Sequence, residues 1–236
     1  MEQLTRAWVR IPSGLGSGLE LYVLPPSEPG YVSGCAEPGV HEILSEHIHR
    51  GGCFYDVGAH IGYYSLIAAR LVGETGQVVA FEPDPDNLEL LRTNCERNDL
   101  HGVAICTNAA WSHGGKVEFQ RGSDNSRMTG RVVDQSSQQA ASRSHSLFCN
   151  AVTLDLFAMQ NRPPSFVKID VEGGEVEVLK GARTLLAEVG PTLLIEVHDE
   201  VSVDAILEIL FPLAYVLQPR TSGLAANLNC FVQHRT

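Results

Sequence analysis

The stretch Phe54-Tyr55-Asp56-Val57-Gly58-Ala59-His60-Ile61-Gly62 decides the fold, together with Phe81-Glu82-Pro83-Asp84 further along the chain. The first segment is typical of a buried strand that runs into a glycine turn and then a helix, and the second of a strand that ends in an acid. Glu82 follows Gly62 by 20 residues. In α/β nucleotide sites, an acid at this distance holds the ribose hydroxyls of the ligand. The two segments therefore predict an α/β nucleotide site.

The glycine spacing separates this site from those that bind pyrophosphate. A dinucleotide site needs G-x-G-x-x-G so that backbone N–H groups approach the phosphates, whereas this turn has Gly58 and Gly62. Asp56, two residues before the first glycine, would repel a phosphate. The pattern favours a ligand with a ribose and an ammonium group but without phosphate, such as S-adenosylmethionine.

The composition is that of an ordinary globular protein. Of the 236 residues, 44% are hydrophobic and 19% are charged, and one domain is the simplest division of such a chain. The net charge of −11, from 17 basic and 28 acidic residues, disfavours a nucleic-acid substrate, which usually demands a basic face. No apolar run approaches the roughly 20 residues that span a bilayer, so no membrane partner is expected. The first residues also lack the basic-then-apolar pattern of a signal peptide.

The six cysteines are scattered along the chain without a C-x-x-C pair. Cys53 and Cys106 fall in predicted strands, where cysteine behaves as a small apolar residue. Without evidence of secretion, we expect all six to be free thiols in a reducing compartment. The sequence therefore predicts a cytoplasmic protein.

The chain divides into an N-terminal preamble over residues 1–50, which packs on the core, and a domain over 51–236. Apolar alternation on both sides of a glycine-rich turn predicts a hairpin in the preamble, followed by a helix over 39–48. From residue 52 onward strands and helices alternate, which predicts an α/β fold with a mostly parallel sheet and helices on both faces. Strands are expected at 53–57, 77–81, 103–109, 116–119, 165–170, 191–197, 215–217 and 229–232, the last a candidate for antiparallel pairing, and helices at 63–71, 86–97, 174–186 and 203–210.

Residues 121–150 interrupt this alternation. Their composition turns polar, and residues 134–144 cannot bury enough apolar surface to become ordered. We interpret the region as a mobile surface loop and a candidate cover for the site. A short helix over 152–157 is expected to follow it, with Thr153 as its N-cap.

Taken together, the motifs resemble those of the FkbM family of S-adenosylmethionine-dependent methyltransferases. They run over residues 55–65, 81–85, 152–155, 167–175 and 178–182. The most specific of these motifs is Lys168-Ile169-Asp170-Val171-Glu172-Gly173, followed by Glu175 and Leu179-Lys180-Gly181-Ala182. The likeness covers about residues 50–198, and the family often has Asn where this chain has His60. It implies a Rossmann-like class I methyltransferase with a seven-stranded sheet, usually an O-methyltransferase on sugars or natural products.

Such an enzyme would transfer a methyl group from S-adenosylmethionine to a hydroxyl of a small-molecule substrate and release S-adenosylhomocysteine. The donor is already activated, so alignment of the reactants can supply roughly 7–11 kcal/mol of the barrier reduction, and a general base adds about 10²–10⁴-fold. Two alternatives stay open. One is a binding module that keeps the nucleoside pocket without catalysis, and the other is a nicotinamide-dependent oxidoreductase, which would lack its third glycine here. A nitrogen acceptor and any oligomeric state are also compatible with the sequence.

The cofactor residues are expected at the ends of the first strands. Glu82 would accept hydrogen bonds from both ribose hydroxyls, and Gly58 and Gly62 would let the backbone approach the ligand. Asp56 would face the methionine part of the ligand, or cap the helix that follows. The remaining cofactor candidates are Ala59, His60 and Pro83 on these turns, Asn108, Ala109 and Trp111 beside the adenine, Asp170, and Glu37, which like Tyr31 could reach the ammonium group.

Acids and a histidine gather where the fourth and fifth strands of the predicted sheet end. We expect Asp170, Glu196 and His198 to form the catalytic group, with His198 as the general base for the acceptor hydroxyl. Crowded carboxylates raise one another's pKa, which would make one of them a usable base. A divalent metal on Asp170, Glu172 and Glu196 is a less favoured interpretation. Glu172 and Glu175 have a structural alternative, since acids stabilise a helix N-terminus.

Overall fold

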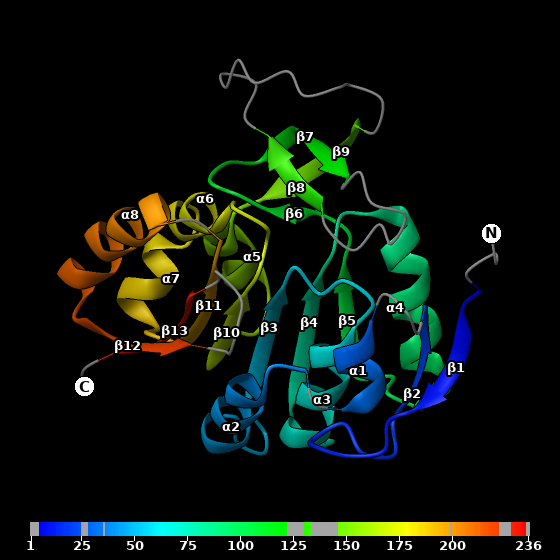
Figure 1. Ribbon diagram of the computed structural model, residues 1–236. Coiled ribbons are helices and arrows are strands. Elements are labelled where there is room, and N and C mark those ends of the chain that lie inside the picture. Colours follow the sequence, from blue (N-terminus) through cyan, green and yellow to red (C-terminus); the bar gives the residue numbers. More distant parts are fainter. Residues whose placement is uncertain are drawn as a thin grey trace.

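A seven-stranded sheet forms the centre of the protein, whose computed structural model describes residues 5–24, 28–34, 36–121, 130–133, 146–198, 200–221 and 228–234 (Figure 1). The strand order is β12-β13-β11-β10-β3-β4-β5. The pairs are parallel except at β13, which runs antiparallel to both β11 and β12. The predicted Rossmann-like fold and its antiparallel last strand are therefore confirmed. These strands are β3 (Cys53–Val57), β4 (Gln77–Phe81), β5 (Val103–Cys106), β10 (Phe166–Ile169), β11 (Thr192–Val197), β12 (Tyr215–Thr221) and β13 (Leu228–His234).

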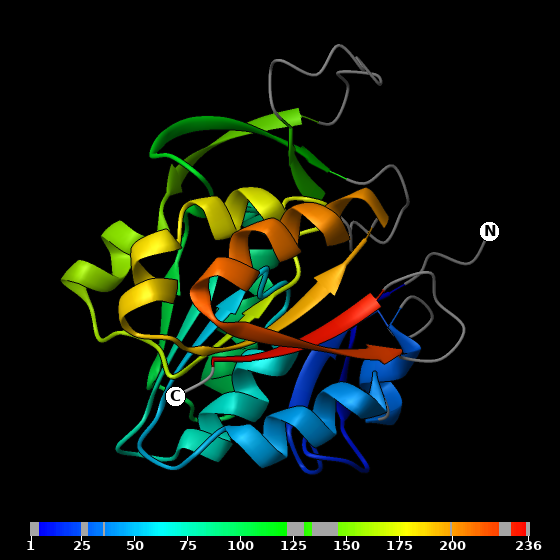
Figure 2. The ribbon, with the colours of Figure 1, turned by 90° about the vertical axis from the view of Figure 1, so that its left-hand side faces the viewer.

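Helices cover both faces of this sheet (Figure 2). One face packs against α2, α3 and α4, and the other against α5, α6, α7 and α8. Within the described ranges, no helix combines the length and apolarity that crossing a membrane requires. The helices are α1 (Pro29–Ser33), α2 (Pro38–His47), α3 (Tyr63–Val72), α4 (Pro85–Arg97), α5 (Leu154–Gln160), α6 (Glu175–Lys180), α7 (Arg183–Glu188), α8 (Glu200–Leu210) and the 3-10 helix η2 (Phe211–Leu213).

The central strands are apolar on both sides, as parallel strands between two helical layers require. Every residue of β3 is buried. Phe54 joins the apolar cluster with α2, α3 and α4, whereas its neighbour Tyr55 joins the cluster with α6, α7 and α8. The continuous apolar run in this strand is thus explained by burial on two faces.

The preamble packs on α4. Its strands β1 (Ala7–Arg10) and β2 (Glu20–Val23) pair antiparallel, so the predicted hairpin is confirmed. The side-chain oxygen of Asn94 accepts a hydrogen bond from the backbone N–H of Tyr22 at 2.7 Å, and that of Asn98 accepts one from Glu20 at 2.9 Å. The hairpin is therefore fixed to the domain through two asparagines of one helix.

A second sheet lies over the carboxyl ends of β3, β4 and β5 (Figure 1), and it corrects the prediction of a loop over 121–150. Its order is β6-β9-β7-β8. The predicted strand over 103–109 ends at Cys106, and β6 belongs to the second sheet. The other parts of the predicted loop, residues 122–129 and 134–145, lie outside the described residues. The four strands are β6 (Ala109–Ala110), β7 (Gly115–Arg121), β8 (Gly130–Val133) and β9 (Ser146–Val152).

The single helix predicted over 174–186 is divided into α6 and α7. Asp155 causes the break, because its backbone N–H donates to the carbonyl oxygen of Gly181 and its carboxylate accepts the N–H groups of Thr184 and Leu185. These contacts cap a new helix start. The predicted cap at Thr153 is confirmed, since its hydroxyl oxygen accepts the N–H of Leu156 at the start of α5.

Candidate active site

The turn after β3 brings backbone to the carboxyl edge of the sheet. Gly58 and Gly62 have φ angles of 85° and 91°, which L side chains rarely adopt. A Cβ at Gly58 would lie 1.8 Å from the carbonyl oxygen of Asp170, so a larger residue would push β3 and β10 apart. Between the glycines, His60 also has a positive φ of 51°. Strained positions of this kind cluster at functional sites.

Glu82 ends β4 and forms part of a cavity wall at this edge. The residue is only 5% exposed. Its carboxylate oxygens accept the backbone N–H groups of His60 and Asp84, both at 2.8 Å. Burial raises the pKa of Glu82 to about 8, although these two donors and Asn87 oppose the rise. The carboxylate therefore needs further donors to be fully stabilised as an anion.

Lys168 is a buried cation at the opposite side of the cavity. Its Nζ lies 2.8 Å from Asp170 Oδ2 and 4.9 Å from the centre of the Tyr64 ring. Burial alone would lower the pKa of Lys168, but Asp170 and Asp56 together raise it above its ordinary value. Burial would likewise raise the pKa of Asp170, but Lys168 holds it below its usual range. The pair is therefore ionised at neutral pH.

Asp56 lies beside this pair in the sheet, since it is the register partner of Lys168. One oxygen, Oδ2, accepts the hydroxyl of Ser65 at 2.6 Å, and the other has no hydrogen-bond partner among the described residues. The residue is 1% exposed and is not one of the described residues that line the cavity. Burial raises the pKa of Asp56, and the positive charge of Lys168 opposes this rise. The direct contact of Asp56 with a ligand stays a prediction.

His198, just after β11, is surrounded by carboxylates. Its Nδ1 lies 3.0 Å from Glu175 Oε1, and its Nε2 lies 3.4 Å from Glu172, 3.7 Å from Asp170 and 3.9 Å from Glu196. Burial opposes protonation, but Glu175, Asp170 and Glu172 raise the pKa of His198 to about 9. These surroundings favour the protonated imidazole, and the role of His198 as a general base stays a prediction.

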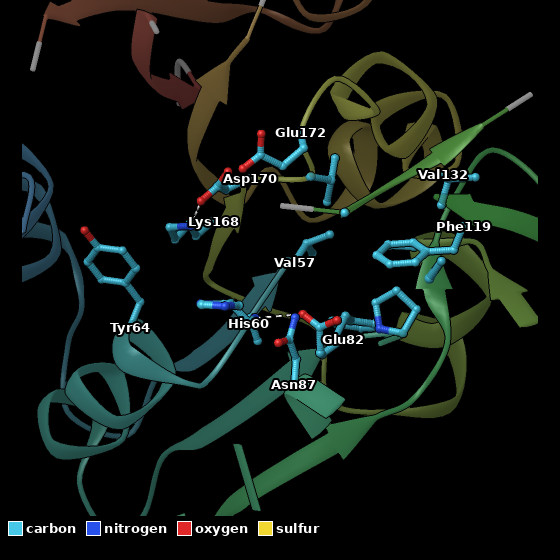
Figure 3. A pocket seen from close by; sticks show the side chains of 18 of the residues that line it. Val57, His60, Tyr64, Glu82, Asn87, Phe119, Val132, Lys168, Asp170 and Glu172 are labelled. Carbon is cyan, nitrogen blue, oxygen red and sulfur yellow. Dashed lines mark hydrogen bonds and ion pairs between the residues drawn. The ribbon is translucent and has the colours of Figure 1, made fainter. Parts of the chain in front are cut away.

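The cavity runs from a charged end to an apolar end (Figure 3). Tyr64 and Lys168 lie on one side, Glu82 lies at the middle, and Phe119 and Val132 lie on the other side. The last two residues come from β7 and β8 of the second sheet. Phe119 falls in the strand predicted over 116–119, whereas Val132 shows that the region predicted as a loop also supplies part of the wall.

Arg121, the last residue of β7, joins the second sheet to the turn after β4. Its guanidinium donates to both carboxylate oxygens of Asp84 at 2.6 and 2.7 Å and lies 3.3 Å from Asp86. The backbone N–H of Asp84 in turn donates to Glu82. A two-bond guanidinium–carboxylate pair has a defined geometry, so it fixes the sheet relative to Glu82.

The preamble contributes Tyr31 to the cavity wall and Glu37 to a contact behind it. Tyr31 lines the cavity and stacks on Tyr63, with ring centres 4.5 Å apart. Glu37 accepts the hydroxyl of Tyr64 at 2.6 Å and is not one of the described residues in the cavity wall. Its predicted contact with the ammonium group stays a prediction, while its observed contact orients Tyr64.

A comparison with protein families identifies the family of this chain. The Methyltransferase FkbM domain matches residues 56–217, which include the end of β3, β4, the second sheet and the cluster around His198. The chain belongs to the FkbM methyltransferase family. The resemblance predicted from the motifs is therefore confirmed.

Among characterised proteins, this FkbM chain is similar to the hexuronic acid methyltransferase AglP of Haloferax volcanii. The two are 28% identical over 163 residues, which make up 69% of this chain and 62% of AglP. This chain thus spans less than two thirds of the length of that relative.

Two solved structures share the fold of this FkbM chain. The methyltransferase FkbM of Methylobacillus flagellatus has a TM-score of 0.54 and 20% identity, with 78% of this chain and 43% of that one aligned. Fibrillarin of Aeropyrum pernix, solved with natively bound S-adenosyl-L-methionine, has a TM-score of 0.52 and 11% identity, with 79% and 68% aligned. At such identities the likeness establishes the fold alone.

The FkbM site brings together most of the predicted cofactor residues. The predicted residues that line the cavity are Gly58, Ala59, His60, Glu82, Pro83, Ala109, Trp111 and Asp170. Those that the structure leaves outside its wall are Asp56, Gly62, Asn108, Glu37, Glu196 and His198. Asn108 lies at a bend between β5 and β6, whereas Trp111 is 7% exposed and joins both the core and the wall.

Several lining residues were missed from the sequence, among them Tyr64, Phe119, Val132 and Lys168. Lys168 carried a signal, because it is a charged residue inside an otherwise apolar strand and needs a partner there. Phe119 and Val132 carried none, since their place depends on the pairing of β7 with β8.

Proposed function

We propose that this chain is an S-adenosylmethionine-dependent methyltransferase that methylates a hydroxyl group of a small molecule, such as a sugar. Glu82 carries the proposal. It is a buried carboxylate on a cavity wall at the carboxyl end of a parallel strand, where α/β folds place ligands. Two ribose hydroxyls would supply the donors that its environment lacks.

The rest of the cavity fits the same ligand. The apolar end, with Ala109, Phe119 and Val132, suits an adenine ring, and Gly58 adds a stretch of cavity wall without a side chain. Tyr64 and Asp170 at the charged end suit a methionine ammonium group. Bound here, S-adenosylmethionine would supply a methyl group on a positively charged sulfur.

The acceptor would enter beside Asp170 and Glu172, which line the cavity. The relative AglP, named for a hexuronic acid, supports a sugar as the acceptor class. The main task of these residues is to orient the acceptor oxygen, because orientation can contribute roughly 7–11 kcal/mol. The cytoplasmic location predicted from the sequence remains a prediction.

Calorimetric titration with S-adenosylhomocysteine tests this proposal. Replacing Glu82 by Ala should weaken binding about 10²-fold or more, since two charge-assisted hydrogen bonds are worth about 1.5–3 kcal/mol each. Glu89→Ala is the matched control, an exposed acid on α4 that should leave affinity unchanged. Equal affinities of both variants would contradict the assignment of Glu82.

A methyl-release assay against hydroxylated compounds separates an enzyme from a binding module. Wild-type protein should form S-adenosylhomocysteine only when an acceptor hydroxyl is present. Tight cofactor binding without turnover on a broad panel of sugars would favour the non-catalytic alternative.

A further inference from the structure

Three donor atoms meet at the edge of the cavity, where β10 and β11 end. Asp170, Glu196 and His198 each offer one atom, and all three atoms lie within 4.8 Å of one another. Nε2 of His198 lies 3.7 Å from Asp170 Oδ1 and 3.9 Å from Glu196 Oε1. Glu172 adds a fourth side chain at 3.4 Å. The side chains of His198 and Glu196 are only 15% and 14% exposed, so the cluster is half enclosed.

The two oxygens of Asp170 have different partners. Oδ2 receives the ammonium group of Lys168 at 2.8 Å, whereas Oδ1 faces His198. The nearest lysine therefore neutralises one side of this carboxylate only. Its other side, together with Glu172 and Glu196, leaves an excess of negative charge around the imidazole.

Glu175 contacts the imidazole of His198 on its Nδ1 side. Its Oε1 lies 3.0 Å from His198 Nδ1 and accepts the backbone N–H of Gly173 at 3.0 Å. Glu175 is fully buried, and its other oxygen has no hydrogen-bond partner among the described residues. A histidine that donates one ring N–H to a buried carboxylate and turns its other nitrogen towards oxygen ligands is the usual arrangement of a metal-bound histidine.

We propose that Asp170, Glu196 and His198 bind a divalent cation beside Glu172 at the edge of the cavity, and that the cation displaces the proton that the surrounding acids favour on the imidazole. Cation ligands about 2.1 Å from the ion lie about 3.0–3.4 Å apart at neighbouring positions, so donor atoms that lie within 4.8 Å of one another need to close by less than about 2 Å. A mixed imidazole and carboxylate set suits Mn²⁺ or Zn²⁺ better than Ca²⁺.

The role that we suggest for the cation depends on the proposed function of the protein. Asp170 and Glu172 also line the cavity, so a cation held beside them borders the space that an acceptor hydroxyl would occupy. A bound cation would attract hydroxyl or carboxylate oxygens of the acceptor and lower the pKa of a coordinated hydroxyl. It would also allow an acidic sugar to approach a mouth that is otherwise lined by carboxylates.

Titration of the chelator-treated full chain with Mn²⁺, without cofactor or acceptor, tests the site. Calorimetry and electron paramagnetic resonance should detect one saturable Mn²⁺ per chain. Glu196→Gln removes a ligand and should weaken Mn²⁺ at least tenfold. Glu175→Gln removes the support of His198 and should weaken it about 10–100-fold. Glu208→Gln, an exposed acid on α8, is the control and should bind Mn²⁺ like the wild type.

The cation proposal and the proposed function fail in different ways. Absence of saturable binding up to 1 mM Mn²⁺, or equal weakening by Glu196→Gln and Glu208→Gln, would overturn the cation site and leave a closed ion-pair cluster around His198. Thermal unfolding and S-adenosylhomocysteine titration of each variant show that its fold is kept. Mn²⁺ binding in a chain that does not bind S-adenosylhomocysteine would instead overturn the proposed function.

Discussion

Glu82 is a buried acid with two backbone donors and an open side towards the cavity. Its pKa of about 8 in the folded chain lies well above the ordinary value near 4.3. The folded state therefore holds a proton that the unfolded state has already released between these two values. This difference links the stability of the unliganded protein to pH.

We predict that the unliganded protein loses stability as pH rises from about 5 to 8, by up to about 1.4 kcal/mol per pH unit from this residue. The sign follows from proton binding, since the folded state binds more protons in this window and rising pH favours the state that binds fewer. Urea unfolding at several pH values measures the slope, and Glu82→Gln should flatten it.

The glutamine variant also serves as the control for other titrating groups. Its amide cannot accept both backbone N–H groups, so the variant should be less stable than the wild type near pH 5, where the folded wild type holds the proton; the slope alone reports that proton. If the stabilities of wild type and variant changed with pH in parallel, another titrating group would be responsible for the pH dependence.

Residues at strand ends could be predicted because the chain order of an α/β sheet fixes its carboxyl edge. Gly58, His60, Glu82 and Asp170 were all placed on the cavity wall by that rule. The partners of His198 were also predicted as a group, but its charge was not. The charge depends on Glu175, whose contact with His198 is set by the way α6 meets β11.

The second sheet turns a polar, apparently unstructured region into part of the site. The sequence did not reveal it because β9 pairs with β7 across a long interval, with Val117 opposite Cys149, and β6 has only two residues. Likewise, the break between α6 and α7 depends on Asp155, a cap from outside the helix. Local patterns cannot report such contacts, since they contain no information about distant partners.

Arg121 makes the second sheet testable as an element. We predict that Arg121→Met weakens S-adenosylhomocysteine binding about tenfold or more. Asp84 is 3% exposed and would lose its guanidinium partner, which disturbs the turn that holds Glu82. Titration calorimetry measures the loss.

Arg131→Met is the matched control for this element, because Arg131 is an exposed residue of the neighbouring strand β8. Both variants remove one positive charge from the same sheet. If the two weakened binding equally, a general charge effect would explain the loss and the Arg121–Asp84 pair would have no special role.

At the scale of the whole molecule, Lys168 connects β10, in the middle of the main sheet, to helix α3, which packs on one face of that sheet. Its positive charge offsets the negative charges of Asp56 in β3 and Asp170 after β10, and its ammonium group lies against the Tyr64 ring of α3. It is 3% exposed. A charge buried at this position stabilises the fold only while its partners remain.

Lys168→Met should therefore destabilise the entire domain by about 3–5 kcal/mol, since it leaves acids buried without their cation. Lys180→Met makes the same change at an exposed pair with Glu177, where side chains are 47% and 30% exposed, and should cost less than about 1 kcal/mol. Urea unfolding at pH 7.5 without cofactor compares the two.

Adding Asp56→Asn to Lys168→Met should recover part of the loss, because the amide removes a buried negative charge. A double variant no more stable than Lys168→Met would attribute the loss to packing around the lysine stem instead of to charge.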